Sequence, residues 1–183
     1  LGYSSDLDLV FVHNCDLNDV TNGNKTLAVG QFYAKLAQRI MHIFNTRMNS
    51  GILYELDMRL RPLGNSGVMV ISLATFEQYQ QEEAWTWEHQ ALVRARAIFG
   101  NSIIVKQFND IRQKVLSNKR DEQSLKKDVL AMRKKMRDHL DKSSRDFIDI
   151  KQGQGGLVDI EFLVQFLVLN HSHQHNELSK FSD

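Results

Sequence analysis

Two aspartates near the start of the chain, separated by one residue, are the side chains best suited to chemistry. Asp6 and Asp8 lead directly into the apolar run "LVFV" of residues 9–12. In an extended segment both carboxylates project from the same face, where like charges repel unless a cation lies between them. Carboxylate oxygens are what magnesium takes, together with waters and substrate phosphates. The pair therefore predicts a divalent-metal platform for phosphoryl or nucleotidyl transfer.

The order of these acids and the strand separates classes of phosphate-handling enzyme. In haloacid-dehalogenase phosphatases and many glycosyltransferases the aspartates follow an apolar strand, whereas here they precede it. The order seen here is typical of nucleotidyltransferases, in which a serine-bearing stretch leads into an Asp-x-Asp strand. Ser4 and Ser5 occupy that stretch and are predicted to contact the nucleotide. The alternative interpretation is that Asp6 and Asp8 are surface residues that cap a turn with these serines.

A second candidate strand, residues 52–62, supplies a third carboxylate. Its apolar and polar residues alternate, so one face carries only charged side chains: Glu55, Asp57, Arg59 and Arg61. Asp57 lies in the middle of the strand and is predicted to share two bound metals with the first pair, next to the attacking group. Arg59 and Arg61 offer guanidinium forks for triphosphate oxygens. A solvent-exposed hairpin face would have the same pattern, and that alternative stays open.

The elements that must position these residues are read from apolar periodicity. We expect strands at residues 6–13, 52–62 and 68–72, the last two forming a hairpin, and helices at residues 30–48, 74–98, 102–117, 124–141 and 156–171. The stripe of the first helix consists of Phe32, Leu36, Ile40, Ile43 and Phe44. The predicted fold class is α+β, a small mixed nucleotidyltransferase-type sheet with flanking helices, followed by a helical region. We place residues 1–100 in a catalytic core, truncated at its N-terminus, and residues 101–183 in a helical extension.

Composition narrows the class of protein. Lys and Arg total 23 against 22 Asp and Glu, so net charge gives no reason to expect a nucleic-acid or membrane partner. The single cysteine, Cys15, excludes an internal disulfide and fits a reducing compartment. No apolar run approaches the length of a membrane span. We therefore expect a cytoplasmic protein. Because the chain starts inside a motif, we also expect it to be part of a longer protein.

The helical half contains three further candidates for contacts with nucleotide. Arg94 and Arg96 lie in "LVRARAIFG", where the alternative is a packing helix with snorkelling arginines. Lys151 precedes the glycine loop and helix of "GQGGLVDIEF", where free amide groups could hold an anion. Residues 119–151 hold eleven lysines and arginines against seven acids, which indicates either a solvated helix face or a binding surface for phosphate or a partner.

Five stretches together resemble the bifunctional glutamine synthetase adenylyltransferases, a family of the DNA polymerase β-like nucleotidyltransferase superfamily. They are "LGYSSDLDLVFVH", "GQFYAKLAQRIMHIF", "SGILYELDMRLRPLGNSGVMV", "EAWTWEHQALVRARAIFG" and "DIKQGQGGLVDIEFLVQFLVL". The resemblance covers nearly the whole chain. Its specific part is R-L-R-P after an acidic strand combined with G-G-x-x-D-I-E-F, whereas Asp-x-Asp alone is common.

The resemblance implies a reaction and a set of partners. Asp6, Asp8 and Asp57 correspond to the family's metal-binding carboxylates, with ATP as substrate and two Mg²⁺ ions that Mn²⁺ can replace. Glutamine synthetase would be the protein substrate, and the PII signalling protein and glutamine the regulators. The family's glycine-rich motif, which contacts the nucleotide phosphates, would lie before residue 1.

Members of this family carry two similar halves with opposite activities. One half transfers AMP from ATP to a tyrosine of glutamine synthetase, and the other removes AMP by phosphorolysis to give ADP. The stretch "EAWTWEHQALVRAR" resembles the adenylylating half, so we expect the forward reaction. The alternatives are the deadenylylating half, which uses the same three acids, and a non-catalytic module that docks a partner through its basic helix.

Overall fold

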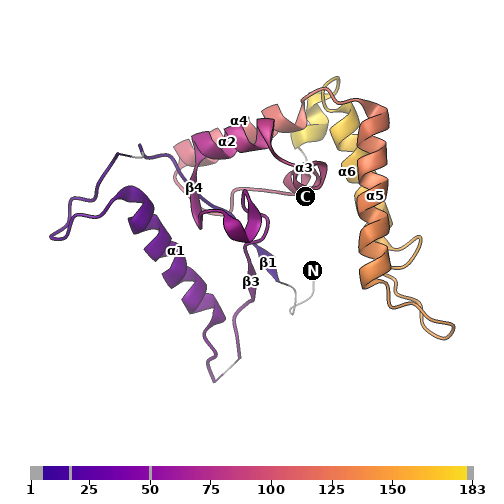
Figure 1. Cartoon of the computed structure of the whole chain (residues 1–183), viewed down its shortest axis with the longest axis horizontal. Coiled ribbons are helices and arrows are strands. Elements are labelled where there is room, and N and C mark those ends of the chain that lie inside the picture. The colour runs from indigo at the N-terminus through magenta and orange to yellow at the C-terminus, as the bar shows by residue number, and fades with distance from the viewer. Residues whose placement is uncertain (1–5, 17, 50, 181–183) are drawn as a thin grey trace. The chain divides into compact units, whose positions relative to one another are not determined.

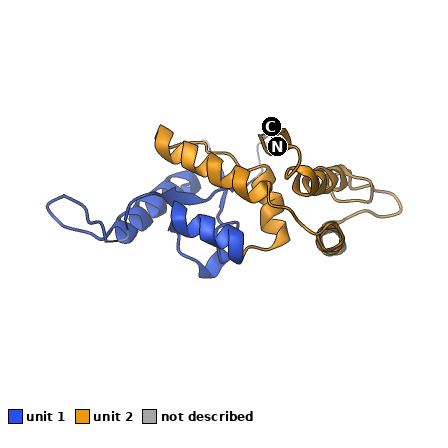
Figure 2. Ribbon diagram, turned by 90° about the horizontal axis from the view of Figure 1, so that it is seen from above, with its two compact units in different colours: residues 1–82 blue, residues 83–183 orange. Residues whose placement is uncertain are grey.

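The computed structural model (Figure 1) describes residues 6–16, 18–49 and 51–180, and it divides into two compact units (Figure 2). The first unit is residues 1–82 and the second is residues 83–183. Short parallel strands and helices make up the chain, which confirms the predicted α+β class. The expected division into a catalytic core, residues 1–100, and a helical extension, residues 101–183, stays a prediction.

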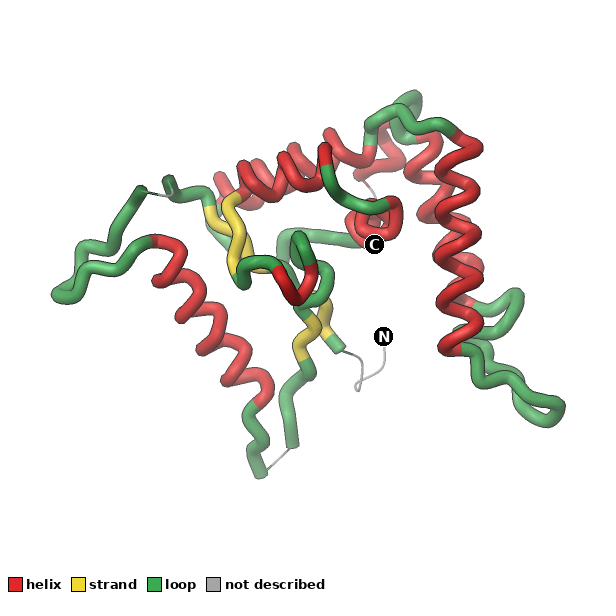
Figure 3. The backbone as a smooth tube through the Cα atoms, viewed as in Figure 1, coloured by secondary structure: helices red, strands yellow, loops and turns green. Residues whose placement is uncertain are grey.

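The first unit is built from two small parallel sheets and two helices (Figure 3). Its elements are β1 (Leu7–Asp8), β2 (Phe11–His13), α1 (Val29–Asn45), β3 (Leu56–Asp57), the 3₁₀ helix η1 (Gly64–Ser66), β4 (Val70–Ser72) and α2 (Leu73–Glu82). Strand β1 pairs with β3, and β2 pairs with β4. The expected strand at residues 6–13 is thus interrupted after Asp8, and each part joins a different sheet.

The predicted hairpin between residues 52–62 and 68–72 is wrong. Both segments contain strands, but β3 and β4 pair with the two N-terminal strands and not with each other. The connection between them is a compact loop in which Leu63 has a φ of 61° and η1 follows. The Arg61 guanidinium donates to the carbonyl of Met58, 2.9 Å away, and thereby braces the start of this loop. Alternation indicates which face of a strand is polar, but it does not identify the partner strand.

Helix α1 is confirmed close to its expected bounds, but its apolar stripe is only partly covered. Phe32, Leu36 and Ile43 are 40, 43 and 62 % exposed, whereas Val29 and Ala37 on the adjoining face are buried. The helix packs against β3 and β4, whose strands are two and three residues long. Strands this short, each from a different sheet, do not cover the full width of the apolar arc.

A buried histidine ties the end of β2 to α1. The His13 ring stacks on Tyr33 with ring centroids 5.2 Å apart and an interplanar angle of 7°. Its Nδ1 accepts the backbone N–H of Cys15 at 3.3 Å, and the Cys15 Sγ lies 3.6 Å from the Tyr33 hydroxyl. Burial lowers the pKa of His13, because the charged imidazolium loses its hydration there.

The second unit is a cluster of helices arranged around α3 (Thr86–Val93). The others are α4 (Ser102–Leu116), α5 (Glu122–Leu140), α6 (Leu157–His171) and the 3₁₀ helix η2 (Asn176–Lys180). Helix α3 packs against α4, α5 and α6. Within the described ranges, no helix combines the length and apolarity needed to cross a bilayer.

One expected helix, residues 74–98, is two helices in the structure. Helix α2 ends at Glu82 and α3 begins at Thr86. The side chain of Glu88 accepts the backbone N–H of Trp85 at 2.9 Å, which satisfies an amide group at the start of α3. Periodicity alone misses this break, because the apolar spacing continues through it.

Arg112 is a buried cation whose partners are backbone carbonyls. Its Nε donates to Leu92 at 2.9 Å, its Nη2 to Val93 at 2.5 Å and its Nη1 to Ser179 at 2.5 Å. Two of these carbonyls belong to the last turn of α3, where the Leu92 carbonyl also accepts the Ala95 N–H at 3.2 Å. Desolvation lowers the pKa of Arg112. The guanidinium thus joins α4 to α3 and η2.

Replacing Arg112 by methionine should destabilise the second unit. The Arg112→Met change keeps a long apolar stem but removes a buried donor from three carbonyls, and we expect a loss of about 3 kcal/mol in the free energy of unfolding. Urea unfolding followed by circular dichroism measures it. The matched control is Lys106→Met, an exposed position on the same helix, which should change stability by less than about 0.5 kcal/mol. Equal effects of the two changes would contradict the assignment.

The buried imidazole of His13 makes stability depend on pH. Its folded-state pKa lies below the ordinary value of 6.5, so the unfolded chain takes up a proton first as pH falls. The His13 contribution to stability is therefore constant above pH 6.5 and decreases as pH falls from 6.5 towards the folded-state pKa. His13→Gln should flatten that part of the stability curve between pH 7.5 and 5.5, whereas His42→Gln, at an exposed position on α1, should not.

Candidate functional site

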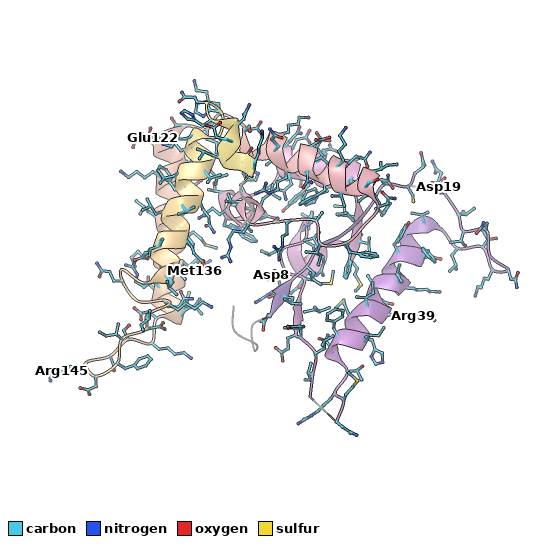
Figure 4. The ribbon with its side chains drawn as sticks, turned by 180° about the vertical axis from the view of Figure 1, so that it is seen from behind. Asp8, Asp19, Arg39, Glu122, Met136 and Arg145 are labelled. Carbon is cyan, nitrogen blue, oxygen red and sulfur yellow. The ribbon has the colours of Figure 1, made fainter. Side chains whose placement is uncertain are left out.

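Two of the predicted acids lie side by side on β1 and β3. The strands are parallel, with Leu7 opposite Leu56 and Asp8 opposite Asp57. The Leu7 N–H donates to Glu55 O at 2.9 Å and the Leu9 N–H to Asp57 O at 2.8 Å. Residues in register across a pair project from the same face. Asp8 and Asp57 are therefore expected on the same face of the strand pair; Figure 1 shows β1 beside β3, and Figure 4 labels Asp8.

Arg59 provides the positive charge at this face. Its backbone N–H donates to Asp57 Oδ1 at 2.8 Å and its Nε to Asp57 Oδ2 at 2.7 Å, and its Nη2 forms an ion pair with the same Oδ2. These bonds hold the pKa of Asp57 below its ordinary value. The pKa of Arg59 is raised, first by the hydrogen bond with Asp57 and then by the charges of Asp57, Asp8 and Asp6. One guanidinium thus lies in the field of all three predicted acids.

The three acids suit a hard divalent cation by donor type, but they are not already assembled around one. In the part of the chain that the structure describes, no three His, Cys, Asp or Glu side chains are grouped closely enough to hold a metal ion. Carboxylates without a cation repel each other, and both oxygens of Asp57 are engaged by Arg59. Arg59 supplies the positive charge that neutralises Asp57. The metal-binding and catalytic roles of Asp6, Asp8 and Asp57 stay predictions.

The two arginines of the "RLR" motif have different surroundings. The Arg61 guanidinium donates to the backbone carbonyls of Met58, Asn65 and Gly67, at 2.9, 3.4 and 3.5 Å. It therefore holds the loop after β3, and its predicted contact with a triphosphate stays a prediction. The side chain of Arg59 is 74 % exposed and binds a carboxylate that is 13 % exposed. Ser4 and Ser5 lie outside the described residues.

Arg94, Arg96 and Lys151 belong to the second unit. Arg94 Nη1 donates to Glu161 Oε1 at 2.9 Å, an ion pair between α3 and α6 with both side chains well exposed. Exposed pairs of this kind contribute about 0–1 kcal/mol, so the pair leaves Arg94 free to exchange partners. Arg96 and Lys151 are exposed. The predicted contacts of all three with nucleotide stay predictions.

The expectation of free amide groups at the start of α6, after the glycine loop, is wrong. The N–H groups of Leu157, Val158 and Asp159 donate to the carbonyls of Ile150, Lys151 and Gly156 at 3.0, 3.1 and 3.0 Å. A Cβ atom at Gly156 would lie 2.5 Å from the Ile150 carbonyl oxygen. These glycines allow close packing of the loop on itself, so the structural alternative describes the amide groups better than an anion site.

Asp159, next to this loop, has a structural role that sequence analysis missed. Its carboxylate accepts bonds from Arg133 Nε at 2.5 Å, Arg137 Nη2 at 3.0 Å and Gly155 N at 2.7 Å. Burial alone would raise the pKa of Asp159, but the bonds from Gly155, Arg133 and Arg137 outweigh it and lower the pKa. Two cations of the basic stretch 119–151 are thus used within the fold. Their i, i+4 spacing on α5 was the available signal.

A family model for glutamate-ammonia ligase adenylyltransferase matches residues 1–111 of the chain. The match spans both parallel sheets and includes Asp6, Asp8, Asp57 and Arg59, and it ends inside α4. It covers more than half of the sequence, and it agrees with the resemblance found in the sequence motifs. The chain therefore belongs to the glutamate-ammonia ligase adenylyltransferase family, the adenylyltransferases that act on glutamine synthetase.

Proposed function

We propose that this chain carries the adenylylating activity of its family, transfer of AMP from ATP to a tyrosine hydroxyl of glutamine synthetase with release of pyrophosphate. The observation that supports it best is the register of β1 and β3, which puts Asp8 beside Asp57. Adjacent carboxylates on neighbouring strands are the donors that nucleotidyl transfer uses. The forward direction rests on the resemblance of residues 83–96 to the adenylylating half.

The proposed chemistry is an in-line displacement at the α-phosphorus of ATP. The tyrosine oxygen forms a bond to phosphorus while the bond to the β-phosphate oxygen breaks, and the tyrosine proton passes to Asp57. Two Mg²⁺ ions, replaceable by Mn²⁺, would bind Asp6, Asp8 and Asp57, lower the pKa of the hydroxyl and neutralise phosphate charge. Arg59 orients the leaving pyrophosphate through its guanidinium fork. Positioning and charge neutralisation supply most of the rate.

The setting of this reaction is also proposed from the family resemblance. Glutamine synthetase is the protein substrate of the family, and PII and glutamine are the proposed regulators of this chain. Cytoplasmic location fits a substrate of nitrogen assimilation and a chain with one cysteine.

Asp8→Asn should remove most of the transfer rate and leave the fold intact. We expect incorporation of radiolabelled AMP into glutamine synthetase to fall about 100-fold or more, because a charged donor is lost. The melting temperature should stay equal or rise, since the repulsion between Asp8 and Asp57 is relieved. Glu55→Gln, which removes an exposed carboxylate on the same segment as Asp57, is the matched control and should keep the rate. A large loss of stability in Asp8→Asn would make Asp8 structural.

The direction of the reaction is tested with two substrates in parallel. The full chain is incubated with unmodified glutamine synthetase and ATP, and separately with AMP-modified glutamine synthetase and inorganic phosphate. We expect AMP incorporation and pyrophosphate release in the first reaction and no ADP in the second. Release of ADP that disappears in Asp6→Asn would assign the chain to the deadenylylating half. Absence of both activities, together with absence of metal binding, would support the docking module.

A further inference from the structure

Arg59 binds Asp57 in the way that a metal ion would have to bind it. The backbone N–H of Arg59 takes Oδ1 of Asp57, and Nε and Nη2 take Oδ2. Both carboxylate oxygens are therefore used. A cation approaching Asp57 meets a guanidinium already in place, and the two positive charges also repel each other.

The contacts of Arg59 differ from those of a structural arginine. Among the described residues, its side-chain hydrogen bonds go to Asp57, whereas the guanidinium of Arg61 donates to three backbone carbonyls. It is 74 % exposed, so moving it uncovers no core. Arg59 can therefore leave Asp57 without unfolding any part of the unit.

The carboxylates around Arg59 attract its guanidinium and hold it in place while no other anion is bound. Arg59 forms an ion pair with Asp57, and Asp8 lies beside Asp57 in the register of β1 and β3, so the guanidinium lies close to more than one carboxylate. A triphosphate offers several oxygens with the same bidentate geometry for a guanidinium. The phosphate group can therefore compete with Asp57 for Arg59, while a divalent cation competes with Arg59 for Asp57.

We infer that Arg59 is an exchangeable counter-ion, which blocks divalent-cation binding at Asp57 in the free protein and transfers to the nucleotide triphosphate when the two ligands bind together. This inference rests on the proposed function, because it assigns Asp57 to the metal site. It adds a coupling between the two ligands. Nucleotide that draws Arg59 away tightens metal binding, and by linkage metal tightens nucleotide binding by the same factor. The acids are thus kept neutralised until substrate is present.

The test measures Mn²⁺ binding directly, by the loss of the free Mn²⁺ signal in electron paramagnetic resonance. The full chain and its Arg59→Gln variant are titrated with Mn²⁺, alone and with the non-hydrolysable α,β-methylene analogue of ATP. The matched control is Arg39→Gln, which removes the same charge from an exposed position on α1 (Figure 4). Thermal unfolding of each variant verifies that it is folded, and Arg59→Lys replaces Arg59→Gln if that variant is not.

Without nucleotide, Arg59→Gln should bind Mn²⁺ about five- to tenfold more tightly than the unchanged chain, because a competing ion pair and a nearby positive charge are both gone. Arg39→Gln should match the unchanged chain. Arg59→Lys keeps the charge but not the fork, so it should fall between the two. The gain in Mn²⁺ affinity on adding the nucleotide analogue should be larger in the unchanged chain than in Arg59→Gln.

Two other outcomes are distinguishable. Equal Mn²⁺ affinity in the unchanged chain and Arg59→Gln, with binding that Asp57→Asn abolishes, would overturn the counter-ion role and leave the proposed function standing. No Mn²⁺ binding that depends on Asp8 or Asp57 in any variant, with or without nucleotide, would overturn both proposals.

Discussion

The adjacency of Asp8 and Asp57 is the constraint on which the site depends. Backbone hydrogen bonds between β1 and β3 fix it, and each contributes about 0.5–1.5 kcal/mol. Repulsion between two carboxylates about 5 Å apart is about 1 kcal/mol in water and several times larger where water is partly excluded. Two short strands are a weak restraint against that force. The charge of Arg59, two residues after Asp57, offsets part of this repulsion while the ion pair is in place.

The residues that follow β3 explain how these acids are attached to the rest of the fold. Met58, directly after the strand, is buried, whereas the side chain of Arg59 is exposed and binds Asp57. The apolar side chain anchors the segment, and α1 packs against β3 from within the same unit. Because only one residue separates Asp57 from Arg59, both are delivered to the same face by the same anchor. The loop held by Arg61 then ends the strand.

Sequence patterns located these residues but not all of their partners. The helices and the acidic strands follow from periodicity and composition, which are properties of single segments. Strand pairing is a property of two segments, and the strong Leu-Asp-Met-Arg alternation was equally compatible with a hairpin and with parallel pairing to β1. The same limit applies to the loop before α6, where carbonyls of residues 150, 151 and 156 occupy amide groups that "GQGG" left open. The sequence "RLR" does not distinguish Arg59 from Arg61. Only their contacts in the structure show that Arg61 binds backbone carbonyls of a loop, whereas Arg59 binds a carboxylate.

The buried arginines of the second unit make the position of Arg59 more distinctive. Arg112 and Arg133 are buried, and both donate hydrogen bonds to backbone carbonyls. A guanidinium in such a place is fixed, because removing it would leave several carbonyls without donors in a desolvated space. Arg59 differs from both: its side chain is accessible, and its ion-pair partner in the described part of the chain is a carboxylate that the proposed reaction also needs. Arg112 and Arg133 are thus held in place by the fold, whereas Arg59 can change partner without uncovering a core.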